Sequence, residues 1–102
     1  MHSTPAELTH IAAPADAQHV EPWVDENGDG TTWGRYVRGT RRSTTGLEIV
    51  VAGWQSADGT VERHAFASAT DVALNAAALR RLAAVALNAA EELDRLDEGA
   101  DQ

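Results

Sequence analysis

Two segments in the middle of the chain show the spacing of apolar and polar side chains that is typical of β-strands. In residues 32–38, successive side chains are expected to point to opposite faces of a strand, with Trp33, Arg35 and Val37 on one face. Residues 47–54, LEIVVAGW, are dense in β-branched and aromatic residues. The segment between them, GTRRSTTG, is polar and is bounded by Gly39 and Gly46. We therefore expect two strands joined by a long hairpin loop over residues 39–46.

Asp58-Gly59 follows the second segment and predicts a two-residue type I′ hairpin, because that turn needs a positive φ at both central positions. Such a turn pairs Ala57 with Thr60 and fixes the register of the strand that follows. One face then carries Leu47, Ile49, Val51, Gly53, His64, Phe66 and Ser68. The other carries Val50, Ala52, Trp54, Val61, Arg63, Ala65 and Ala67. Both faces are largely apolar, so we expect both to be covered.

The C-terminal third has the period of an amphipathic helix. Asn75 is a favoured N-cap residue, which starts the helix at Ala76, and Gly99 is expected to end it. One apolar stripe consists of Leu79, Leu82, Ala86, Ala89, Leu93 and Leu96. Val85 and Leu87 lie off this stripe and indicate a second contact surface.

These elements predict an α+β fold, in which an antiparallel sheet of three to four strands is followed by one long C-terminal helix in two layers. Residues 1–18 are expected to form a flexible arm, residues 19–98 a single domain, and residues 99–102 a disordered tail. A single helix leaves one sheet face uncovered, which favours a homodimer. The dimer or partner surface is expected to include Val50, Trp54, Val61, Val85 and Leu87.

Composition narrows the class of protein. The chain has 102 residues, which suits one domain, and it has no cysteine, which excludes disulfides and thiolate metal sites. Its formal charge of −8 disfavours nonspecific binding to nucleic acid. We find neither a secretory signal nor an apolar run long enough to span a membrane, so we expect a cytoplasmic protein that does not bind a membrane.

Residues 25–36, DENGDGTTWGRY, begin like a calcium-binding loop, with Asp25, Asn27 and Asp29 at alternate positions before Gly30. The twelfth position should be a bidentate glutamate, and it is Tyr36. Asn-Gly and Asp-Gly are turn dipeptides, and both flanking segments have the composition of strands. We therefore interpret this segment as a strand connection and expect neither a metal site nor a cofactor.

A group of arginines and aromatic residues is the candidate ligand site. Arginine with aromatic side chains is a plausible platform for a nucleotide or for single-stranded nucleic acid, through phosphate contacts and base stacking. The alternative is an exposed strand edge whose arginines pair with the acidic arm and helix end. The residues concerned are Trp33, Arg35, Tyr36, Arg38, Arg41 and Arg42.

No combination of residues indicates catalysis. The sequence contains no P-loop, no Gly-x-Ser-x-Gly motif and no Gly-x-Gly-x-x-Gly motif. His2, His10 and His19 lack the spacing of a ligand pair, and His64 stands alone on its strand. We therefore expect a protein that is not an enzyme.

The segment that runs from Gly53 through DGTVER to LNAAALRRLAAVALNAAEELDRL resembles small uncharacterised proteins of actinobacteria and their phages. The resemblance covers residues 45–97 and implies an Asp-Gly hairpin followed by an Ala-rich helix, with no established activity or site residues. Asn75 stands where those proteins usually carry threonine.

Together these observations favour a non-enzymatic, homodimeric accessory or regulatory protein that binds itself and another protein. A nucleotide or nucleic-acid binder is the alternative. An acidic protein that occupies a basic DNA-binding surface is a third possibility.

Overall fold

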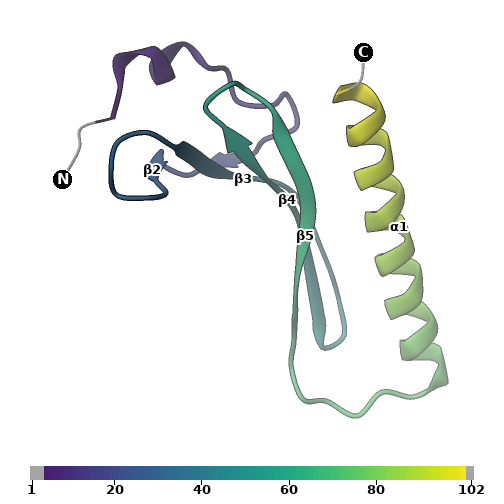
Figure 1. Ribbon diagram of the computed structural model, residues 1–102. Coiled ribbons are helices and arrows are strands. Elements are labelled where there is room, and N and C mark those ends of the chain that lie inside the picture. The colour runs from purple at the N-terminus through teal and green to yellow at the C-terminus, as the bar shows by residue number, and fades with distance from the viewer. Residues whose placement is uncertain (1–3, 101–102) are drawn as a thin grey trace.

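The computed structural model describes residues 4–100 and has an α+β fold, an antiparallel sheet followed by one long helix that packs against it (Figure 1). The strands are β1 (His19–Val20), β2 (Val24–Asp25), β3 (Trp33–Thr44), β4 (Leu47–Ser56) and β5 (Val61–Ala69), and the helix is α1 (Ala76–Ala100). The long strands β3, β4 and β5 pair in sequence order, and the two short strands pair with the other edge of β3. This confirms the predicted fold class. Residues 1–3, His2 among them, and residues 101–102 lie outside the described part.

Strand β3 is longer than the sequence predicts. The polar segment 39–46 is not a long loop, because β3 continues to Thr44 and pairs there with Leu47. Only Thr45 and Gly46 connect the strands, and Gly46 has a φ of 77°. The register shifts between Arg38 and Arg41, which is a β-bulge. The extra residue changes the alternation, so Arg38 and Arg41 share one face of the sheet.

The register of the β4–β5 hairpin differs from the prediction by one residue. Gln55 pairs with Val61, and the Ser56 amide donates to the Thr60 carbonyl over 2.9 Å, so the loop between Ser56 and Thr60 holds three residues. Gly59 has a φ of 92°, and no described non-glycine residue has a positive φ, so Asp58 cannot take part in a type I′ turn. The slip moves every β5 side chain to the opposite face.

Helix α1 begins as predicted, with the amide of Ala78 donating to Oδ1 of Asn75 over 2.9 Å. It continues through Gly99 to Ala100. The residues turned from solvent are Ala78, Leu82, Val85, Ala89, Glu92, Leu93 and Leu96. The predicted stripe is therefore rotated, because Leu79 is 53% exposed and Ala86 is exposed. Alanines define the direction of an apolar stripe poorly, since they sit on either side of a helix at little cost.

One face of the sheet, which we call the covered face, carries both the N-terminal segment and α1. The segment contains the 3₁₀ helix η1 (Ala6–His10), whose Leu8 is 5% exposed. Its carbonyls at Ile11 and Ala12 accept hydrogen bonds from β3 and β4. The rest of the face lies against α1 (Figure 1). Residues 4–18 of the predicted arm thus lie on the sheet.

The core is small and the molecule is a thin plate. Its extents are 52 × 33 × 18 Å, and its radius of gyration is 16.6 Å, whereas a compact domain of this length has about 13 Å. The buried apolar residues are Leu8, Trp33, Val37, Ile49, Val51, Ala52, Ala78 and Ala89. Within residues 4–100, no helix combines the length and the apolar character needed to cross a membrane.

Candidate interaction surface

The face of the sheet away from α1, which we call the open face, carries a cluster of aromatic rings. Tyr36 and Trp54 are cross-strand partners with ring centroids 4.7 Å apart and planes at 75°. The ring centroid of Phe66 lies 5.9 Å from that of Tyr36 and 5.0 Å from that of His64, and both contacts are edge to face. Such contacts favour association of aromatic rings beyond simple burial of area. We call Tyr36, Trp54, His64 and Phe66 the aromatic cluster.

The backbone around the cluster is shaped to hold it. A methyl group at Gly34 would overlap the indole of Trp54, so the glycine makes the space in which that ring lies. Ala52 is 1% exposed, and it pairs with His64 in the centre of the sheet. Tyr36 remains 41% and Phe66 47% exposed. The cluster therefore packs against the backbone of the sheet on one side and is accessible to solvent on the other.

Charged side chains of both signs surround the cluster. Nη2 of Arg38 lies 3.7 Å from Oε1 of Glu21, and Nε of Arg41 lies 3.7 Å from Oε1 of Glu48. All four side chains are at least one-third exposed, so each pair contributes little to stability. Glu62, opposite Trp54, adds another acid. These charged residues form a rim around the aromatic cluster that carries both signs of charge, so the surface is not a purely cationic platform.

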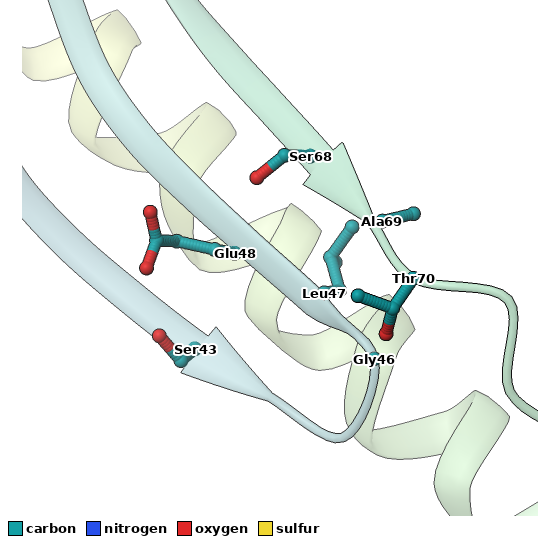
Figure 2. A pocket seen from close by; sticks show the side chains of 7 residues that line it. All are labelled: Ser43, Gly46, Leu47, Glu48, Ser68, Ala69 and Thr70. Carbon is teal, nitrogen blue, oxygen red and sulfur yellow. The ribbon is translucent and has the colours of Figure 1, made fainter.

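The pockets described on this face are open to solvent. One of about 190 Å³ lies beside Phe66, between Arg38, Arg41 and Val50. A second, of about 370 Å³, lies near the β3–β4 turn, where Figure 2 shows Ser43 and Glu48 on neighbouring strands with α1 behind the sheet. Hydroxyls and one carboxylate do not form a catalytic arrangement.

The six residues of the predicted arginine and aromatic site divide between the two faces. Tyr36, Arg38 and Arg41 lie on the open face. Trp33 is 6% exposed, and its indole N–H donates to the Gly30 carbonyl over 3.1 Å. The β3 bulge and the alternation of the strand thus separate residues that are neighbours in the sequence.

Arg35 belongs to a buried polar network on the covered face. Its Nε donates to Oε1 of Gln55 over 2.7 Å, its Nη2 donates to the Ile11 carbonyl over 3.1 Å, and its guanidinium lies 4.3 Å from the Trp23 ring centroid. Burial lowers the pKa of Arg35 from its usual value. Gln55, which is 2% exposed, also donates to the Ala12 carbonyl. These contacts attach the N-terminal segment to the sheet.

A salt bridge between Arg63 and Asp16 completes this attachment. The two guanidinium nitrogens each donate to one carboxylate oxygen over 2.8 Å, a bidentate arrangement with strong directional preference. The Arg63 side chain is 9% exposed. Gly39 leaves room for Asp16, because a Cβ there would lie 3.1 Å from its Oδ2.

Arg42 joins the sheet to α1. Its Nη2 donates to Glu92 over 2.8 Å, and the Thr40 hydroxyl donates to the same carboxylate over 2.7 Å. Burial raises the pKa of Glu92, but the hydrogen bonds from Arg42 and Thr40 and the charges of Arg42 and Arg95 outweigh burial, so this pKa lies below its usual value. Nη1 of Arg42 is buried with no hydrogen-bond partner.

The predicted dimer or partner surface is also divided. Val50 and Trp54 lie on the open face, Val61 and Val85 lie between sheet and helix, and Leu87 is 62% exposed on α1. His64 and Phe66 were assigned to the wrong face by the predicted register. The signal that would have placed them is the length of the Asp-Gly loop, and the sequence does not distinguish two residues from three.

The Asp25 segment is a connection between β2 and β3. The Asp25 carboxylate accepts from the amides of Gly28 and Gly30 over 3.1 and 2.9 Å, and Oδ1 of Asp29 accepts from Thr31. Gly28 and Gly30 both have positive φ. The carboxylate oxygens thus bind the backbone of their own loop. The described residues contain no group of three His, Asp or Glu side chains that could hold a metal ion.

Comparison with known proteins gives no relative: the chain matches no protein-family model, no curated protein and no solved structure. The geometry of the open face and of α1 therefore carries the functional argument.

Proposed function

We propose that this chain is a non-enzymatic interaction protein that forms a homodimer through the open face of its sheet. The observation that carries the proposal is the aromatic cluster, in which Tyr36 and Phe66 remain 41% and 47% exposed on a face that no other described element covers. Aromatic side chains that are fixed by their neighbours and accessible to solvent are enriched at the centres of interfaces.

The surface area of the chain supports a second copy. It exposes 6686 Å², whereas a compact monomer of 10.8 kDa exposes about 5,500 Å². The surplus, about 1,200 Å², exceeds the area that one partner contributes to a standard interface, about 800 Å². Packing two sheets face to face would bury the cluster of each copy, as in a β-sandwich.

The rim charges suit contact between two identical surfaces. A two-fold interface brings each surface against itself, so charged side chains can pair across it only if the surface carries both signs. Arg41 lies on β3 in the row of Val50 and Phe66, whereas Glu62 lies on β5 in the row of Trp54 and Tyr36, so the two charges are at opposite corners of the aromatic cluster. An antiparallel arrangement of two copies would bring Arg41 of one near Glu62 of the other.

The test is the oligomeric state of a variant with Tyr36→Asp and Phe66→Asp, measured by sedimentation equilibrium. The wild type is expected to be dimeric or larger at about 100 µM, and the variant is expected to dissociate at least about tenfold more readily, because two carboxylates would be desolvated at the interface. The matched control, Tyr36→Phe with Phe66→Leu, keeps the surface apolar and should associate like the wild type. A wild type that stays monomeric, or a variant that associates equally well, would contradict the proposal.

A nucleotide or nucleic-acid binder is the second candidate, since Tyr36, Arg38 and Arg41 share the open face. The carboxylates of Glu21 and Glu48 beside these arginines weaken it, because they compete with phosphate. A labelled single-stranded oligonucleotide should then bind in low salt and lose affinity in Arg38→Gln with Arg41→Gln. Equal binding by the wild type and this variant would exclude the site.

A further inference from the structure

The outer side of α1 carries a second apolar surface. Leu79 and Leu87 are 53% and 62% exposed, and exposed apolar side chains point to an interaction surface only where they form a continuous patch. They are not isolated, because exposed apolar residues continue along the same side at helical spacing. The residues are Leu79, Ala83, Ala86, Leu87 and Ala90, and we call them the outer stripe.

The charges of α1 run against the helix dipole. Arg80 and Arg81 lie near its N-terminus, whereas Asp94, Asp97 and Glu98 lie near its C-terminus. A helix is stabilised by the opposite arrangement, because its N-terminus carries partial positive charge. Within residues 4–100 none of these five side chains has an ion-pair partner, so the fold of one chain gives no reason for the arrangement.

A second copy of α1 in antiparallel orientation satisfies both observations. Arg80 precedes Leu87 by seven residues, and Asp94 follows it by seven. Seven residues are about two turns, so all three lie on the same side of the helix. Two helices that cross antiparallel at Leu87 therefore place Arg80 of each copy opposite Asp94 of the other, with the alanines allowing close approach.

We propose that the outer stripe of α1 is a second self-association surface, on which the α1 helix of another copy packs antiparallel through Leu87 and through reciprocal pairs between Arg80 and Asp94. It is independent of the open face. With both surfaces in use, the smallest closed assembly is a tetramer built as a dimer of dimers.

The experiment uses the full chain with Tyr36→Asp and Phe66→Asp, so that association through the open face is suppressed. One variant adds Arg80→Glu and Arg81→Glu, and the other adds Asp94→Arg and Asp97→Arg. In each variant alone, like charges face one another across the proposed contact, so the dissociation constant should rise by at least about tenfold. In both variants the new charges suit the helix dipole, so the melting temperature of the protein should not fall.

The decisive sample is an equimolar mixture of the two charge variants. The glutamate at position 80 of one variant would then face the arginine at position 94 of the other, and the native Asp94 and Arg80 would form the second complementary pair. Sedimentation equilibrium should show a heterodimer with a dissociation constant within about threefold of the parent. Association of the parent should weaken at 0.5 M salt, because exposed charge pairs are screened.

Two controls keep the result specific. Glu7→Arg with Asp71→Arg changes the net charge as much as Asp94→Arg with Asp97→Arg, at exposed positions outside α1, and should leave association unchanged. Leu87→Ser should weaken association with no change of charge.

A monomeric parent, charge variants that associate like the parent, or a mixture that fails to recover would overturn the inference. The open-face dimer is tested separately, by Tyr36→Asp and Phe66→Asp in the otherwise native chain.

Discussion

The two faces of the sheet are built from the same three strands and differ in what holds their side chains. On the covered face, polar groups are buried and paired: Arg63 with Asp16, and Arg42 with Glu92. On the open face, arginines are paired only loosely, at 3.7 Å and with exposed side chains, and the aromatic rings face solvent. Arginine therefore fastens the layers on one side and borders a free surface on the other. The same residue type is buried in layer-to-layer salt bridges on one face and exposed beside the aromatic cluster on the other.

The largest expected effect is the loss of Glu92. Glu92→Ala leaves Arg42 partly buried without its partner, because the Arg42 side chain is 19% exposed. The free energy of unfolding should fall by about 3 kcal/mol, the lower end of the range for a broken buried pair. Urea denaturation at fixed protein concentration measures it. Glu91→Ala, one position along and exposed, should change it by less than about 0.5 kcal/mol, and equal effects would remove the distinction.

The next effect tests whether the open face is packed from below. Gly34→Ala places a methyl group within the indole of Trp54, so the ring must move. The free energy of unfolding should fall by about 2 kcal/mol, as for overpacked sites, and tryptophan fluorescence should shift. Gly99→Ala, which has open space around the new methyl group, serves as control and should not destabilise. An unshifted spectrum in Gly34→Ala would show that Trp54 is not held as described.

Acid should act on the covered face through Glu92. Its pKa is below the usual value, so the folded state favours the carboxylate and the pair stabilises the fold above the unfolded-state pKa, about 4.3. As the pH falls below this value, the unfolded chain takes up the proton first, and stabilisation declines until the folded state is protonated as well. The difference in unfolding free energy between wild type and Glu92→Gln should therefore shrink below about pH 4.3. A constant difference would refute this assignment.

The smallest effect compares adjacent arginines on opposite faces. Arg41→Gln removes an exposed pair at 3.7 Å and should change the free energy of unfolding by less than about 0.5 kcal/mol. Arg42→Gln, its neighbour in β3, should cost clearly more, because Glu92 is only 14% exposed. Equal melting curves for the two variants would mean that the β3 bulge does not set their faces.

The positions of the strands and the helix could be predicted well from the sequence, but the face of the sheet or helix on which each residue lies could not. Strand and helix positions follow from local periodicity, and Asn75 correctly marked the start of α1. The face of each residue depends on single-residue details that periodicity does not contain. A three-residue Asp-Gly loop in place of a two-residue turn reversed the faces of β5, and a bulge after Arg38 put Arg41 on the open face and Arg42 on the covered face.

The residues of the candidate interaction surface could be predicted only in part for the same reason. Val50 and Trp54 were predicted for the uncovered apolar sheet face and Tyr36 for the arginine and aromatic site, and all three lie on the open face. Arg42 was chosen with them because no local signal reveals a partner fifty residues away in α1, at Glu92. Contacts of this range arise from tertiary packing, and a single sequence holds no direct record of them.

The attachment of α1 has a consequence for motion. The only buried apolar residues that the described helix contributes are Ala78 and Ala89, which bury little area, and one carboxylate ties it to β3. The strands β3, β4 and β5 are joined by short hairpins, and their hydrogen-bonded pairing does not involve the helix. In hydrogen exchange, α1 should therefore open as a unit at a lower free energy than the sheet, and its amides should exchange before those at the centre of β4.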